Sequence, residues 1–305
     1  MAFVNYLWSR LSDTMVVHIE APITMIDLHS HSTISDGLLS PTALVQHAHA
    51  KGIKVLSLTD HDDVEGLKEA TSEAKLLGMH LIHGVEISVT WKRGTIHIVG
   101  LNVDSENKTL LQGLSSIREG RFERAKQMAH ALDKVGIKGS LEGALKYAKS
   151  GILGRTHFAR FLVETGHAKD VRTIFKNYLV KGKPGFIEHT WTTLENALTW
   201  IHESGGIAAI AHPARYDLGK NNLLAFLNEF KALGGQGIEV ISGSHTTEDS
   251  LKFARIADEF EFLASIGSDY HGPGISYKEM GSLPKLPETC VPIWKSWNEV
   301  NALLN

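Results

Sequence analysis

From residue 25 onward, the chain alternates short apolar runs with stretches in which apolar residues recur every three or four positions. Short apolar runs bounded by turn residues predict buried strands, and the wider spacing predicts amphipathic helices. The pattern predicts strands at 25–29, 53–60, 81–88 and 95–101, with helices at 40–52 and 64–78. This βαβα order is typical of a largely parallel sheet or a barrel.

Helix-terminal residues support these elements. Ser40 is a plausible N-cap, Pro41 takes the first helical position and Gly52 is a natural stop. Later in the chain, Thr192 and Glu195 read as a capping box at the start of a helix over 192–206.

The pattern changes between residues 105 and 190. Helix-period stretches dominate there, at 110–136 and 156–166, with little sign of strands. Strand and helix alternation then resumes up to residue 272, and a short helix within 291–304 ends the chain. The sequence therefore predicts an α/β fold in four parts: an extension (1–24), a first barrel part (25–104), a helical insertion that caps the substrate (105–190) and a second barrel part (191–305).

Composition narrows the function classes. The 305 residues are 43% hydrophobic and 21% charged, with a net charge of −3, so we expect a globular protein without a DNA-binding or membrane-binding charge patch. The single cysteine, Cys290, excludes an intrachain disulfide and suits a reducing cytoplasm, where we expect the protein. Arg10 and Asp13 interrupt the opening segment, and apolar runs of about 18 residues are missing, so neither a signal peptide nor a membrane span is expected.

Histidine is the unusual feature, with 17 occurrences. Histidines and carboxylates follow the apolar runs of one predicted strand after another, and in α/β barrels such positions converge on the catalytic face. His29 and His31 are two apart on an extended chain and point to the same side. Ligands without thiolate suit Zn, Mn or Fe, and their number implies two or three ions. The nine candidate ligands are His29, His31, Asp36, His61, Glu86, His97, His212, Asp269 and His271.

Each motif also has an ordinary structural reading. A single His-x-His is weak evidence, and a buried histidine or a His-Pro turn is commoner than a metal ligand. Asp62 and Asp63 read as turn or helix-start carboxylates. We leave eight histidines as structural: His18, His47, His49, His80, His83, His130, His167 and His202.

Read together, six motifs resemble those of the PHP (polymerase and histidinol phosphatase) superfamily over residues 25–280. They are DLHSHSTISDG, SLTDHD, GVEIS, HIVGL, AHPARY and GSDYH. Within the superfamily the chain is similar to the bacterial 3′,5′-nucleoside bisphosphate phosphatases, or TrpH-like proteins, some of which are 5′-to-3′ exoribonucleases on short RNA.

The resemblance implies a distorted (β/α)7 barrel with three divalent metal ions, usually Mn²⁺, with Zn²⁺ or Fe²⁺ as alternatives. All nine candidate ligands match the family pattern, with Glu86 and Asp269 as bridging carboxylates. A hydroxide held between two metals would attack phosphorus. We therefore expect Glu86, Asp269 and His212 to act in catalysis.

A bisphosphate substrate needs a second anion pocket. The motif GRTHFAR in the insertion offers cations, and Arg155 and Arg160 are five apart, so they would not share one helix face. Arg155 is instead expected just before a helix, with Thr156 near its N-cap. The candidate substrate contacts are Arg155, His157, Arg160, Lys183, Arg215, Ser242 and His245, each of which could also be an ordinary surface or structural residue.

Three functions stay open at this point. The first is a nucleoside 3′,5′-bisphosphate phosphatase that also degrades short RNA. A histidinol-phosphate type of phosphatase fits the metal ligands equally, but not the basic helical insertion. A non-catalytic metal-binding domain would be signalled by missing ligands, and all nine are present. The metal, the preferred substrate and the oligomeric state are not decided by the sequence.

Overall fold

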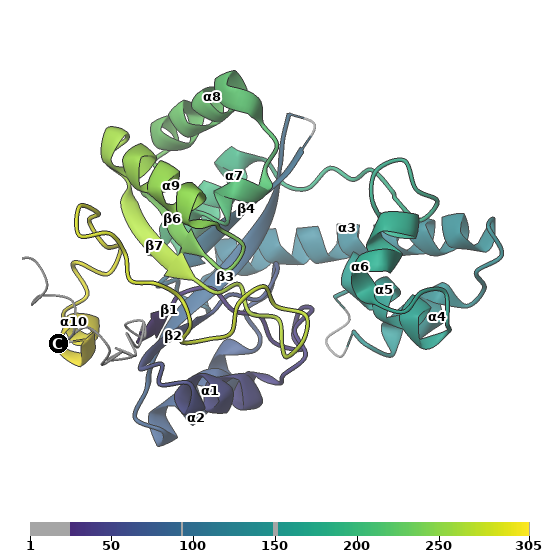
Figure 1. The fold of residues 1–305 in the computed structure, drawn as a ribbon, viewed down its shortest axis with the longest axis horizontal. Coiled ribbons are helices and arrows are strands. Elements are labelled where there is room, and N and C mark those ends of the chain that lie inside the picture. Colours follow the sequence, from purple (N-terminus) through teal and green to yellow (C-terminus); the bar gives the residue numbers. More distant parts are fainter. Residues whose placement is uncertain (1–24, 93, 149–151, 305) are drawn as a thin grey trace, which may run out of the picture.

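The strands close into a barrel. The computed structural model describes residues 25–92, 94–148 and 152–304, so the extension predicted at 1–24, with His18, lies outside the described residues. Backbone hydrogen bonds from Leu28 N to Ile266 O and from Asp269 N to His29 O, both 2.9 Å, join the end of the first strand to the last. Figure 1 shows β1 near β7. Neighbours pair in chain order: β1 (Ile26–Asp27), β2 (Val55–Leu58), β3 (His80–Trp91), β4 (Gly94–Leu101), β5 (Ile207–Ile210), β6 (Gly237–Ser242) and β7 (Leu263–Gly267).

The predicted α/β barrel is confirmed, with one difference in its strand directions. β4 runs antiparallel to both β3 and β5, while the other neighbours pair parallel. β3 ends at Trp91 and β4 begins at Gly94, and so short a connection allows only a hairpin. The helix expected between consecutive parallel strands is therefore replaced at this point by a long two-stranded arm.

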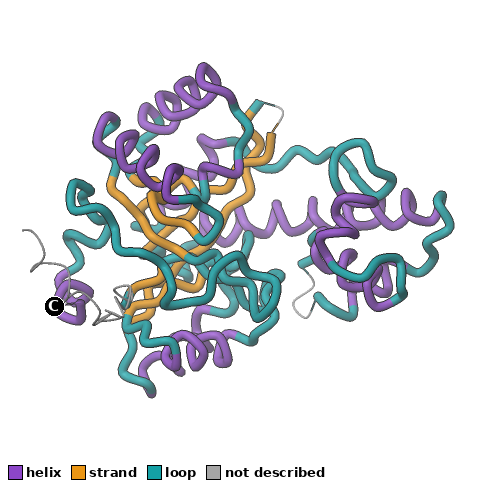
Figure 2. The backbone as a smooth tube through the Cα atoms, viewed as in Figure 1, coloured by secondary structure: helices purple, strands orange, loops and turns teal. Residues whose placement is uncertain are grey.

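Helices surround the strands (Figure 2). Ser40 caps the first helix as predicted, but Thr193 rather than Thr192 caps the helix after the insertion, by accepting from Asn196 N. The helices are α1 (Pro41–Ala50), α2 (Leu67–Leu76), α3 (Lys108–Asp133), α4 (Ser140–Leu145), α5 (Arg155–Glu164), α6 (Val171–Ile174), the π-helical turn η1 (Phe175–Leu179), α7 (Leu194–Glu203), the 3₁₀ turn η2 (Pro213–Arg215), α8 (Gly219–Ala232), α9 (Thr247–Glu259) and α10 (Asn298–Leu304).

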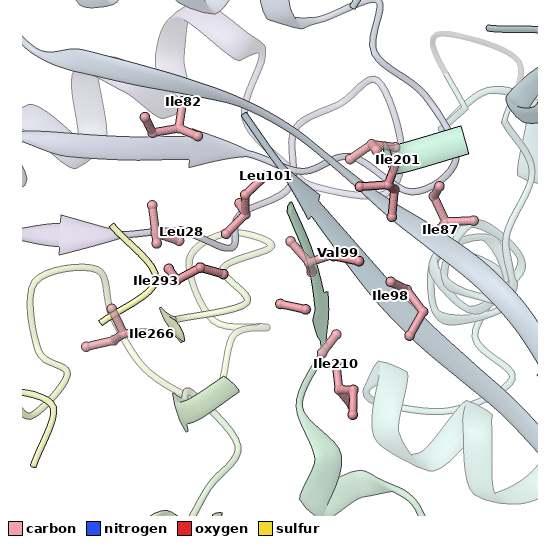
Figure 3. Close-up of a cluster of buried hydrophobic side chains, with 14 of the residues drawn as sticks. Leu28, Ile82, Ile87, Ile98, Val99, Leu101, Ile201, Ile210, Ile266 and Ile293 are labelled. Atoms are coloured by element: carbon pink, nitrogen blue, oxygen red, sulfur yellow. The ribbon is translucent and has the colours of Figure 1, made fainter. Parts of the chain in front are cut away.

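The barrel is filled by branched aliphatic side chains from the strands and the surrounding helices. Figure 3 shows Leu28, Ile98, Val99 and Ile266 gathered in one cluster with Ile201 of α7, and all of these are buried. Removing their apolar surface from water is the main stabilising contribution. The same packing fixes the strand ends that carry the polar residues.

A second, smaller core lies in what we call the helical lobe, residues 125–148 and 152–187. It contains Leu132, Phe158, Leu162 and Leu179, and Figure 1 shows α4, α5 and α6 set apart from the strands. The 26-residue helix α3 belongs to both cores, because its first half packs in the barrel core and its second half in the lobe. None of the helices in the described residues is long and apolar enough to cross a membrane.

Candidate metal centre and cationic cavity

All nine predicted ligands meet at one end of the barrel. Their donor atoms form three overlapping sets, and within each set the atoms lie within 4.8 Å of one another. Because every member of the sets was predicted from its position after or within an apolar run, the convergence expected from the strand pattern is found. The sets are His31, Asp36, His61 and His271; His29, Glu86, His212 and Asp269; and His61, Glu86 and His97.

Two of these ligands are not at strand ends, contrary to the prediction. Glu86 lies inside β3 and His97 inside β4, where Glu86 pairs with Val99 and His97 with Ser88. The hairpin extends past the ends of the parallel strands, so its middle, rather than its end, is level with the site. The isolated bridge between His61 and Glu86 marks this level.

Glu86 is the central group. It is fully buried, and its Oε1 lies 2.9 Å from His97 Nδ1 and 2.8 Å from His212 Nε2. Its Oε2 lies 3.3 Å from the Nε2 atoms of both His29 and His31. His61 Nδ1 also lies 2.9 Å from Oε2, so the two oxygens of this one carboxylate face five imidazoles.

Asp269 and Asp36 complete the arrangement. Asp269 Oδ1 lies 3.4 Å from His29 Nε2 and 3.1 Å from His31 Nε2, so these two histidines face the same pair of carboxylates. Asp36 Oδ1 lies 3.1 Å from His271 Nε2 and 4.0 Å from His61 Nε2. The three ligand sets therefore overlap, because Glu86 belongs to two of them and His61 belongs to two.

The donors fit divalent cations. Within the described part of the chain, Asp36 Oδ1 and Glu86 Oε2 are buried without a hydrogen-bond partner, although His61 Nδ1 is only 2.9 Å from Glu86 Oε2. Buried polar atoms are almost always satisfied. Nitrogen and oxygen donors that face each other at this distance, but without hydrogen-bond alignment, are typical of ligands around shared ions. The clusters therefore fit divalent metal binding.

The electrostatics of the ligands agree with this. Burial alone would raise the pKa of Glu86, but the charges of His61, His97 and His29 hold it well below its usual range. Burial would lower the pKa of His31, but its hydrogen bond to Asp269 and the charges of Glu86 and Asp269 raise it to about 10. Despite burial, the pKa of His29 is likewise raised well above its usual value by the charges of Glu239, Glu86 and Asp269, so without cations the protons on His29 and His31 compensate the buried carboxylates. Metal ions must displace such protons in order to bind.

A carboxylate that the sequence prediction missed orients two ligands. Glu239, buried on β6, lies 2.5 Å from His29 Nδ1 and accepts from His212 N at 2.5 Å. Because an ionised carboxylate only accepts, Nδ1 of His29 carries the hydrogen and Nε2 is left to coordinate. The signal was a glutamate in the otherwise apolar run GIEVIS, which has no place in a buried strand without a partner.

Asp62 lies in a turn, as expected, but it also has contacts that the sequence did not predict. It is fully buried, and it accepts from Ser88 N at 2.7 Å and from Arg121 Nε at 2.7 Å. Arg118 donates to the Asp62 carbonyl oxygen at 3.0 Å. Two arginines of α3 therefore hold the loop that carries His61.

The backbone is strained at the centre. Among the described residues, six non-glycine residues have positive φ, and three of them are His212 (28°), Asp269 (54°) and Asp62 (52°). Such conformations cost about 1–3 kcal/mol each and persist where the surroundings enforce them. Two of the three are candidate ligands and the third is next to His61.

A cationic cavity of about 320 Å³ adjoins the ligands. Asp36, His61 and His97 form part of its wall. Its lining also includes Arg121, Arg124, Arg155, Lys181, His189 and Trp191.

The guanidinium groups in this cavity repel each other. Burial and the charges of Arg155 and Arg121 lower the pKa of Arg124 to about 9. Among the described residues, Arg155 makes a cation–π contact with Phe175 at 5.7 Å and forms no ion pair. Arg121 and Arg124 both lie over the ring of Trp191. A buried cluster of cations with so few acidic partners is typical of an anion-binding site.

Comparison with known proteins places the chain in a family. The PHP domain matches residues 27–205, which is more than half of the chain. The chain belongs to the PHP domain family. It is 49% identical over 271 residues to the 3′,5′-nucleoside bisphosphate phosphatase of Chromobacterium violaceum, covering 88% of this chain and 95% of the relative. It is 40% identical over 275 residues to the 5′-3′ exoribonuclease Rnm of Escherichia coli, covering 90% and 94%.

Two solved structures have the same fold. An amidohydrolase from Chromobacterium violaceum, solved with bound sulfate and no metal, matches with a TM-score of 0.87 and 48% identity over 90% of this chain and 96% of that one. A metal-dependent phosphoesterase from Bifidobacterium adolescentis matches with a TM-score of 0.77 and 25% identity, covering 93% and 97%. The recognition made from the six motifs is therefore confirmed.

The predicted substrate contacts of this PHP domain fall into two groups. Arg155 lies in the cavity, as the first residue of α5 with Gly154, not Thr156, as N-cap. Arg160 donates to the Asp36 carbonyl oxygen, and Thr156 Oγ1 donates to Asp36 Oδ2 at 2.9 Å. Arg215 pairs with Asp269. These cations lie beside the centre.

The remaining predicted contacts lie elsewhere. His157 is buried, accepts from Gly154 N at 3.0 Å and bonds the Ser35 backbone, so it caps α5 instead of facing either cavity beside the centre. Lys183 is exposed, and Lys181 lines the cavity in its place. Ser242 and His245 are outside the walls of both cavities, and His245 Nδ1 lies 3.1 Å from the Val240 carbonyl oxygen.

Arg121, Arg124 and Trp191 were not predicted as site residues. A signal was present, because Arg121 and Arg124 are three apart on a predicted helix and so share a face. Nothing in the sequence shows that this face meets the barrel at Asp62, 59 residues away.

Proposed function

We propose that this PHP domain is a metal-dependent phosphoesterase that hydrolyses the 3′-phosphate of nucleoside 3′,5′-bisphosphates and removes nucleotides from the 5′ end of short RNA. The observation that carries the proposal is the cationic cavity next to the three ligand groups. It offers a site for one phosphate, while the ligand groups offer a site for another. The names of the bisphosphate phosphatase and exoribonuclease relatives support it.

We propose three ions, Mn²⁺ first and Zn²⁺ or Fe²⁺ as alternatives, held by the nine ligands, with Glu86 and Asp269 bridging. Bound divalent ions would polarise the phosphoryl oxygens and lower the pKa of a bound water. The chain itself positions these groups: Glu239 fixes the tautomer of His29, and burial with the charge of Arg215 lowers the pKa of His212 to about 4, which keeps its imidazole neutral for coordination.

In this proposal the cavity holds the 5′-phosphate. Arg155, Arg124 and Arg121 would bind its oxygens, and the ribose would then extend toward Asp36 and His61, with the 3′-phosphate at the ligand groups. Arginine is suited to this because its planar fork can donate two hydrogen bonds to one phosphate. A substrate without the second phosphate would leave Arg124 and Arg155 without an anionic partner, whereas Arg121 would keep its pair with Asp62.

One assay tests the function. Purified protein with Mn²⁺ receives adenosine 3′,5′-bisphosphate, a short 5′-phosphorylated RNA, or histidinol phosphate, and phosphate and nucleotide release are measured. We expect turnover of the first two. Turnover of histidinol phosphate alone would overturn the proposal in favour of the small-molecule alternative, and binding of Mn²⁺ without turnover of any substrate would favour a non-catalytic domain.

A further inference from the structure

A second, larger cavity borders the metal centre on its other side. This groove, of about 1230 Å³, has Asp269 and His271 in its wall, whereas the cationic cavity has His61 and His97. Arg155 and Thr156 line both cavities and form the edge between them. An extended substrate bound across the candidate metal ligands could therefore have one end in each cavity.

The groove combines cations with two aromatic rings, of which that of Tyr277 is exposed. Arg215 lies over the ring of Tyr277 at 5.2 Å, and Tyr277 is 66% exposed. Arg172 is exposed on α6, and the Phe175 ring contacts Arg155.

The two carboxylates in the wall are already engaged. Asp269 pairs with Arg215, and Asp170 caps α6 by accepting from Thr173 N at 2.7 Å. The cations of the groove thus exceed its free acids. Aromatic rings beside a cationic groove are the common design of proteins that bind single-stranded nucleic acid.

We propose that this groove binds the RNA strand that follows the scissile phosphate, with a base stacked on Tyr277 and backbone phosphates near Arg172 and Arg215. The inference rests on the proposed function. A bisphosphate has only a free oxygen at this position and leaves the groove empty, whereas an oligonucleotide fills it. The groove therefore determines how well RNA competes with mononucleotides.

The reaction is balanced with water as the only co-reactant. Water oxygen forms a bond to phosphorus, the P–O3′ bond breaks, and O3′ of the first nucleotide takes a proton. The first nucleotide is released from the cationic cavity, and the strand in the groove is left with a new 5′-phosphate. That end has the chemistry that the cationic cavity binds.

The test compares kcat/KM for a 5′-phosphorylated pentaribonucleotide with kcat/KM for adenosine 3′,5′-bisphosphate, as a ratio, in holoenzyme with Mn²⁺. We expect Tyr277→Ala to lower the ratio about fivefold or more, because it removes a stacking platform. Tyr277→Phe keeps the ring and should restore the ratio. Arg172→Ala should lower the ratio less and reduce its dependence on salt. Lys176→Ala removes an exposed cation outside the groove and is the matched control.

The outcomes separate the two proposals. An unchanged ratio in Tyr277→Ala and Arg172→Ala would overturn the proposal that this groove binds RNA. An equal loss on both substrates would also overturn it, because the groove would then hold part of every substrate. Wild-type protein that turns over neither substrate would instead overturn the proposed function. Circular dichroism of each variant confirms that it is folded.

Discussion

Every candidate metal ligand comes from the barrel, whereas the arginines of the cationic cavity come from α3 and from the start of α5. The barrel holds its ligands tightly, on strands and by buried carboxylates such as Glu239. The cavity arginines Arg124 and Arg155 have few partners, and their charges repel Arg121 and each other. Separate cores allow acids and cations to face the same small space without pairing fully. The carboxylates of the candidate metal ligands and the arginines of the cationic cavity are thus held close together, and in the proposed function a bisphosphate substrate would contact both.

The largest effect should come from the barrel side. Glu86→Ala removes the carboxylate that five imidazoles face, so we expect loss of bound metal and of nearly all turnover while the chain stays folded. Metal analysis, bisphosphate turnover and circular dichroism measure this. Glu248→Ala, an exposed glutamate on α9, is the control. Full activity in Glu86→Ala would refute its bridging role.

The next effect concerns the buried ion pair between Arg121 of α3 and Asp62 of the barrel. Arg121→Met leaves Asp62 buried without its ion pair, which should reduce the free energy of unfolding by about 3–5 kcal/mol. Arg118→Met, one turn earlier on α3 and contacting the same loop through the Asp62 carbonyl, should cost about 1 kcal/mol. Urea denaturation at neutral pH compares the two. Equal, small losses would show that the buried pair does not join the regions.

A pH effect should follow from His157, which links the lobe to the loop of Asp36. Burial lowers the pKa of His157 to about 4. The neutral imidazole is thus favoured in the folded chain, and the unfolded chain takes up the proton first as pH falls. Its contribution, on the order of 3 kcal/mol, is present above pH 6.5 and is lost between pH 6.5 and about 4.

Urea midpoints of wild type and His157→Gln, measured from pH 7.5 to 4.5, test this contribution. The variant should lose stability less steeply than wild type over that interval. His130→Gln, on the exposed part of α3, is the control for removing a histidine. Parallel curves for wild type and His157→Gln would contradict the prediction.

On the cation side, Arg155→Ala should lower kcat/KM for the bisphosphate about 10- to 100-fold, mainly through KM, because a charge-assisted contact to phosphate is lost. Steady-state kinetics measure it, with the exposed Arg255→Ala as control. Unchanged kinetics would remove Arg155 from the phosphate site.

The smallest effects test whether the two cores unfold together. A Cβ at Gly113 of α3 would collide with Trp200 of α7, and one at Gly143 of α4 would collide with Phe161 of α5. Gly113→Ala and Gly143→Ala should each cost about 1–3 kcal/mol. Because α3 belongs to both cores, both should shift one common calorimetric transition. Gly120→Ala, where the new Cβ would meet only the His189 ring at 3.2 Å, is the control, and two separate transitions would contradict the prediction.

The sequence predicts the barrel side better than the cation side, for a physical reason. Ligands such as His29 and Asp269 follow apolar strand runs, and a closed barrel brings strand ends together whatever the details. His157 and Lys183 were selected by a local motif, but which side of a helix or turn faces the cavity depends on packing. Asp62 lies in a turn as predicted, but its buried ion pair was not predicted, because its partner, Arg121, is 59 residues away and becomes a neighbour only after α3 docks on the barrel.

The left-handed backbone at His212 and Asp269 bears on any attempt to engineer a more heat-resistant variant. At such positions glycine relieves strain, so a search that scores only the folded chain would favour replacing both residues. Either replacement would delete an imidazole or a carboxylate from the centre. Thermostabilising substitutions should therefore be sought away from the candidate metal centre, for example on exposed helix surfaces. His212 and Asp269 should be left unchanged.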